Sequence, residues 1–155
     1  TTRQVGWAAV CTLGVLAALG FVALAFRLPL MAELPNEGWN AVHALHAFSR
    51  DLYPDPHLGI VNNYPPLWHY LTGALAIALG DPILPGRVVG CIALAVCVCG
   101  VFALASALGA TRIASALAAT WLAAVLAIQF RVLVGTAEPQ MLATALVVVA
   151  PAMVV

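Results

Sequence analysis

The sequence predicts an all-α fold, a polytopic bundle of transmembrane helices with an interfacial helix in its first loop. Hydrophobic residues make up 64% of the chain and charged residues 8%, and the mean hydropathy is +1.04. A soluble domain needs about 25% charged residues, whereas lipid solvates an apolar exterior. Five apolar segments, near residues 5–26, 66–79, 88–108, 113–130 and 139–155, fill the chain as a single transmembrane module at roughly 20 residues per span.

The first apolar segment, residues 5–26, has no charge and lies between Arg3 and Arg27. Its length suffices to cross about 30 Å of hydrocarbon. It is too long for the core of a signal peptide, so we expect a retained span. Because the chain begins without Met and ends inside an apolar segment, we expect it to be a fragment of a longer protein.

The polar loop, residues 27–63, holds four of the six acidic residues and three of the four histidines. Within it, residues 38–50 have helical spacing, with Asn36 as the expected N-cap. Trp39 and Phe48 suit a helix that lies at the membrane interface. We therefore expect a juxtamembrane helix that begins near Glu37.

The later segments begin with residues typical of helix starts. Two prolines, Pro65 and Pro66, precede the segment at 66–79 and favour an extended backbone followed by a helix. Small residues are dense in the segments at 88–108 and 113–130, and such residues let helices approach closely in a membrane. We expect these segments to pack against one another.

Charge and cysteine content exclude several function classes. The net charge is zero and there is no basic cluster, so no nucleic-acid partner is expected. The four cysteines lie in apolar segments, where free thiols are expected.

Arginines divide evenly between the two sides, so the positive-inside rule does not orient the chain. The long acidic loop resembles an exported one, which favours a multi-pass plasma (inner) membrane protein with its first loop extracytoplasmic.

The same topology separates two carboxylates. If every segment crosses, Glu37 and Glu138 lie on opposite sides of the membrane. They share a side only if one segment does not cross, and the short segment at 66–79 is the most plausible, or if a segment boundary differs. Because ionisable residues near membrane depth are functional candidates, the position of Glu138 matters for any mechanism.

Glu37 is the principal catalytic candidate because it follows a span and opens the interfacial helix. A carboxylate at that depth could act as a general base or hold a divalent cation. The alternative is an acidic residue of a first helical turn, which stabilises the helix N-terminus. Glu138 is a functional candidate because of its membrane depth, and the alternative is again an acidic residue of a first helical turn.

Histidines and arginines supply further candidates. His43 and His46 could share a helix face and bind a divalent metal ion with Asp55, although no strict metal motif is present. Arg87 and Arg131 could bind a phosphate, and His69 a lipid phosphate. The alternatives are interfacial histidines that contact water or headgroups, and arginines whose charged ends reach the headgroups.

Four motifs in order resemble a known family. They are Asn36-Glu37-Gly38-Trp39-Asn40-Ala41, Leu52-Tyr53-Pro54, Asn63-Tyr64-Pro65-Pro66-Leu67 and Pro85-Gly86-Arg87-Val88-Val89. Over about residues 5–140 the chain resembles the N-terminal part of GT-C fold membrane glycosyltransferases, such as protein O-mannosyltransferases and lipid A aminoarabinose transferases.

The resemblance implies inverting transfer of a sugar from a polyprenyl-phosphate donor to an acceptor at the extracytoplasmic face. It implies that Glu37 is the base, that Glu138 is the second acidic residue near the acceptor, and that Tyr64 lies near the donor. Asn36 replaces the first acid of the family's usual pair, which puts activity in doubt. The chain also ends after about five segments, roughly half the number in full-length relatives.

Two other function classes stay open. A transporter or channel subunit would need ionisable residues within spans and broken helices, whereas the charges here lie at the ends of segments. A histidine-based membrane metal or redox protein would need facing histidines at matching depth, and only His69 lies near a span. The sequence does not specify the sugar, the acceptor or the oligomeric state.

Overall fold

The computed structural model describes residues 35–59, 61–130, 133 and 135–152, and this part of the chain is helical without strands. The predicted all-α class is therefore confirmed for the described residues, and the first predicted span, residues 5–26, lies outside them. The elements are α2 (Pro35–Leu45), the 3₁₀ turns η1 (Arg50–Leu52) and η2 (Pro56–Leu58), α3 (Pro66–Leu79), α4 (Leu84–Ala107), α5 (Arg112–Gln129) and α6 (Pro139–Ala152).

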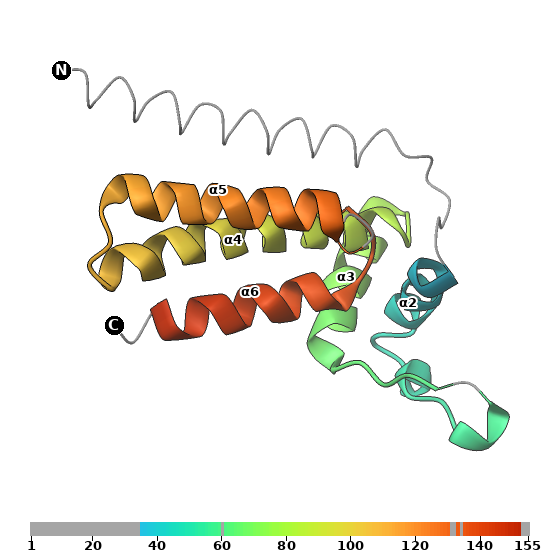
Figure 1. The fold of residues 1–155 in the computed structure, drawn as a ribbon. Coiled ribbons are helices and arrows are strands. Elements are labelled where there is room, and N and C mark those ends of the chain that lie inside the picture. The colour runs from blue at the N-terminus through green and yellow to red at the C-terminus, as the bar shows by residue number, and fades with distance from the viewer. Residues whose placement is uncertain (1–34, 60, 131–132, 134, 153–155) are drawn as a thin grey trace.

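Helices α4, α5 and α6 form the long part of the molecule, and α2 and α3 lie together at one end of it (Figure 1). α4 is the central helix and contacts both α5 and α6. Its buried residues Ala93, Leu94 and Cys97 pack against Met141 and Ala145 of α6. Since α4, α5 and α6 alternate in direction, the beginning of α4, the end of α5 and the beginning of α6 meet beside α2 and α3.

Local sequence explains where these helices begin and end. Pro65 is the N-cap of α3 in an extended conformation, and proline also occupies the first turns of α3 and α4, where its missing N–H leaves no hydrogen bond unmade. The hydroxyl of Thr111 caps α5 by accepting from Ala114 N. Gly80 ends α3 at a φ of 69°, a conformation that favours glycine.

In the described residues, one helix is long and apolar enough to cross a membrane. It is α4, with 24 residues and a mean hydropathy of 2.8, and its length is about 36 Å at 1.5 Å per residue. α3, α5 and α6 are apolar over shorter stretches. This finding supports membrane association weakly, and the multi-pass arrangement stays a prediction.

The juxtamembrane helix differs in its bounds from the prediction. α2 begins at Pro35 and ends at Leu45, so Asn36 lies within the first turn and the expectation that it is the N-cap is wrong. Proline suits this start because it needs no hydrogen-bond partner for a backbone N–H. After α2 the chain turns, and Ser49 caps η1 by accepting from Asp51 N.

α2 buries its polar face and exposes its apolar face, the opposite of a surface helix on a soluble protein. Its buried side carries Glu37, Asn40 and His43 among alanines, whereas Val42 and Leu45 are 53% and 61% exposed. α2 packs closely on α3, because Gly73 leaves room for the backbone of α2: a Cβ there would lie 2.5 Å from the carbonyl oxygen of Ala44. The polar face of α2 therefore points into the protein.

Candidate functional site

The centre of the site is a buried ion pair between α2 and α4. Arg87 Nε donates to Glu37 Oε1 over 2.9 Å and Arg87 Nη2 donates to Glu37 Oε2 over 3.0 Å. The two side chains are 3% and 0% exposed. This two-point geometry matches the planar guanidinium to the carboxylate. Glu37 and Arg87 therefore join the start of α2 to the start of α4.

A third segment, residues 135–138, completes the centre. Glu37 Oε1 also accepts from Ala137 N over 3.0 Å, and Asn40 Nδ2 donates to Ala137 O over 2.9 Å. Ala137 packs directly on Gly86 of α4, where any Cβ would overlap the Ala137 side chain. Because glycine at 86 permits this approach, the segment before α6 lies against both α2 and α4.

Glu138 follows Ala137 and is 2% exposed. Burial raises the pKa of its carboxyl above the ordinary value, and the charge of Glu37 raises it further. Hydrogen bonds with the side chains of Asn36 and Asn40 act in the opposite direction. Glu138 Oε2 has no hydrogen-bond partner. The second carboxylate of the site is thus buried and incompletely satisfied, unlike the first.

These contacts bring together Glu37 and Glu138, which lie on opposite sides of the membrane if every predicted segment crosses. Glu37 bonds to the residue adjacent to Glu138, so the two carboxylates occupy one site. Three helices, α3, α4 and α5, separate them in the chain. The sequence allowed this arrangement only if one segment fails to cross or if a segment boundary differs, and α3, at 14 residues, is the shortest of the three helices. Its position beside α2 is consistent with that alternative (Figure 1).

Two buried histidines contact each other between α2 and α3. The rings of His43 on α2 and His69 on α3 meet edge to face, with centroids 5.8 Å apart. His69 Nε2 lies 3.2 Å from Asn62 Oδ1, which also accepts from Tyr64 N. Burial, followed by the nearby His46, lowers the pKa of His43, so that its imidazole is neutral at pH 7.

The structure does not assemble the proposed metal ligands. His43 is buried, whereas His46 lies in the turn after α2 and is exposed, so the two do not share a helix face. Asp55 is exposed and caps η2 by accepting from His57 N over 2.9 Å. Among the described residues, no group of three or more His, Cys, Asp or Glu side chains is placed to hold a metal ion.

The predicted donor-phosphate residues have different surroundings. Arg87 is bound to Glu37, as described above, and Arg131 lies outside the described residues. His69 is buried at the start of α3. Tyr64 is half-buried, and its hydroxyl accepts from Gln140 Nε2 over 3.2 Å. The structure therefore groups Arg87 and His69 with the acidic centre and Tyr64 with a neighbouring groove.

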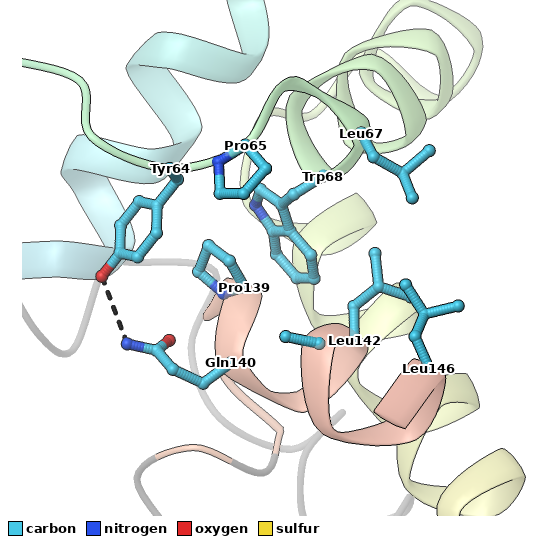
Figure 2. A pocket seen from close by; sticks show the side chains of 9 residues that line it. Tyr64, Pro65, Leu67, Trp68, Pro139, Gln140, Leu142 and Leu146 are labelled. Carbon is cyan, nitrogen blue, oxygen red and sulfur yellow. Dashed lines mark hydrogen bonds between the residues drawn. The ribbon is translucent and has the colours of Figure 1, made fainter. Parts of the chain in front are cut away.

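This groove lies between the start of α3 and the start of α6 (Figure 2). Its volume is about 250 Å³ and its lining is almost wholly apolar. The Tyr64–Gln140 hydrogen bond lies at one end of it (Figure 2). The lining residues are Tyr64, Pro65, Leu67, Trp68, Pro139, Gln140, Leu142, Ala143 and Leu146. Because α6 begins directly after Glu138, the groove and the acidic centre adjoin.

Sequence reasoning did not identify several residues of the site. Asn40 lies three positions after Glu37, on the same helix face, and that spacing could have indicated it. No sequence signal pairs Glu37 with Arg87, His43 with His69 or Tyr64 with Gln140, because these partners are far apart in the chain. Asn62, which holds His69, precedes the predicted span and carried no motif of its own.

Comparison of the chain with protein-family models, with curated proteins and with solved structures gave no match.

Proposed function

We propose that this chain is part of a membrane glycosyltransferase that moves a sugar from a polyprenyl-phosphate donor to an acceptor at the extracytoplasmic face. The observation that carries the proposal is the meeting of two buried carboxylates, Glu37 and Glu138, beside an apolar groove at one end of the helices. A site that transfers a group from a lipid-anchored substrate needs these two parts side by side.

The apolar surface of the described helices supports a membrane setting. Large hydrophobic side chains are exposed on every long helix, among them Ile77, Trp121 and Val147 at 76%, 73% and 72%. On α2 the exposed side is apolar while the buried side is polar. In water such a surface would be unfavourable, whereas in lipid it is solvated. The acidic centre, at the ends of α4, α5 and α6, would then lie near headgroup level.

The groove suits the lipid part of a donor. A polyprenyl tail stays in the bilayer because each buried methylene contributes about 0.8 kcal/mol, so its sugar-phosphate bond is confined to headgroup depth. The groove offers apolar contacts to such a tail, and the polar Tyr64–Gln140 pair lies at one end of it. Residues of this groove would thus hold the donor beside Glu138.

The two carboxylates have different parts in this proposal. Inverting transfer needs one base, because a phosphate leaves without a strong acid, unlike the two-carboxylate chemistry of glycosidases. Both oxygens of Glu37 accept hydrogen bonds from Arg87, and one also accepts from Ala137 N. Glu138 Oε2 has no partner. We assign Glu37 to positioning and Glu138 to accepting the proton, and the prediction that Glu37 is itself the base is tested alongside.

The test measures transfer of radiolabelled sugar from a polyprenyl-phosphate donor by the purified protein in lipid vesicles. We expect Glu138→Gln to abolish transfer and Ala143→Phe, which fills the groove, to raise the KM for the donor. Ala150→Phe, on an exposed part of α6 outside the groove, is the matched control and should leave the KM unchanged. Full transfer by both Glu138→Gln and Glu37→Gln would overturn the proposal.

A further inference from the structure

The buried side-chain atoms that lack hydrogen-bond partners lie on residues that contact each other in pairs, Asn40 with Glu138 and His43 with His69. In the described part of the chain they are Asn40 Oδ1, His43 Nε2, His69 Nδ1 and Glu138 Oε2. Their residues are at most 3% exposed, so bulk water does not reach them freely. A buried polar atom without a partner costs about 1–3 kcal/mol. The unpartnered atoms of the contacting residues Asn40 and Glu138 are therefore a local cost that one additional hydrogen bond could remove.

At least three of these four atoms are hydrogen-bond acceptors when Glu138 is ionised. Because Asn40 Nδ2 donates to Ala137 O, the orientation of this amide is fixed, and Asn40 Oδ1 is an acceptor without a donor. The amide of Asn62 is fixed because Nδ2 donates to Leu52 O and Oδ1 accepts from Tyr64 N. His69 Nε2 therefore carries the hydrogen that Asn62 Oδ1 accepts, and Nδ1 is an acceptor. The site is short of donors.

We infer that Glu138 is a proton-binding site, a carboxyl that is neutral in the resting protein at neutral pH and supplies the hydrogen-bond donor that Asn40 Oδ1 lacks. Protonation converts Glu138 Oε2 from an unpartnered acceptor into an O–H donor. Asn40 Oδ1 is the available acceptor on a side chain that already contacts Glu138. One proton thereby satisfies two of the four atoms.

The charges that face Glu138 favour the neutral form. Glu37, from α2, is the nearest carboxylate, and the guanidinium of Arg87, from α4, is already bound to it. His43 of α2 and His69 of α3 contact each other, and neither is among the groups that act on the Glu138 carboxyl. An ionised Glu138 would place a second negative charge beside a pair that is already neutral overall, in a region of low dielectric. The raised pKa of Glu138 agrees with this geometry.

The inference does not depend on the proposed transferase, because a protonated carboxyl can be observed without substrate. If Glu138 is also the proton acceptor in sugar transfer, the active form arises when it loses this proton to solvent. The rate of sugar transfer would then increase with pH as Glu138 ionises, over the same pH range in which its infrared band disappears. If the protein transfers no sugar, the spectroscopic result still tests the protonation of Glu138.

The experiment is infrared difference spectroscopy on the wild-type protein in lipid vesicles. At neutral pH we expect a carbonyl stretching band of a protonated carboxylic acid that Glu138→Gln removes and Asp51→Asn, an exposed control, retains. In the wild type, raising the pH should abolish the band, and ¹³C labelling of glutamate should shift it, which assigns it to a glutamate; its retention in Glu37→Gln then separates Glu138 from Glu37. Asn40→Leu should shift the band. Absence of a glutamate-derived band at neutral pH, or its persistence in Glu138→Gln, would overturn the inference.

Discussion

Replacing Arg87 by glutamine gives the sharpest test of how the site is held together. Arg87 and Glu37 are 3% and 0% exposed and are joined by two hydrogen bonds of 2.9 and 3.0 Å. Removing one partner of such a buried pair leaves the other charge unpaired and costs about 3–5 kcal/mol, or roughly two to four decades in the folding equilibrium. Because this pair joins α2 to α4, its loss should reduce the unfolding free energy of the whole end of the molecule.

The assay is equilibrium unfolding of the purified protein in a bilayer mimetic, with Arg112→Gln as the matched control. Arg112 is exposed at the start of α5, and such surface changes stay within about 0.5 kcal/mol. The double variant Glu37→Gln, Arg87→Gln leaves no stranded charge and should be less destabilised than the sum of its single variants, by about 0.5–3 kcal/mol. Equal effects of Arg87→Gln and Arg112→Gln would refute a buried ion pair.

Three further predictions follow from the same contacts. The pKa of Glu138 is raised above its ordinary 4.5, so the stability that its protonated carboxyl contributes is present below about pH 4.5 and is lost as the pH rises through the raised pKa. Between these two pH values, the unfolding free energy of the wild type should fall relative to that of Glu138→Gln. The same dependence of unfolding free energy on pH in both proteins would contradict this. Gly86→Val should destabilise the protein by about 1–3 kcal/mol because the added side chain overlaps Ala137, whereas Ala95→Val on the exposed side of α4 should have little effect in the same unfolding assay. In single-tryptophan variants, brominated lipids should quench Trp39, which is 41% exposed on α2, and spare Trp68, which is 3% exposed; equal quenching would argue against a lipid-facing α2.

Local patterns in the sequence located most of the described helices. Prolines at the starts of α3, α4 and α6, a threonine before α5 and the glycine after α3 mark helix ends through backbone geometry that depends on neighbouring residues alone. The bounds of α2 were less accurate: Asn36 was expected as the N-cap, whereas the helix includes Pro35 and Asn36. Which face of α2 is buried depends on what packs there, and spacing alone did not specify it.

By itself the sequence determined the helical class of the described residues and the apolar character that favours lipid, and it identified Glu37 and Glu138 as carboxylates at segment ends. These properties follow from composition and from interactions within a few residues. Tertiary structure alone decided that Glu37 pairs with Arg87, that Glu138 shares its site, and that His43 meets His69. Such pairings join residues tens of positions apart, and they form only because α2 and the segment before α6 both pack on the start of α4, where Gly86 permits the contact with Ala137.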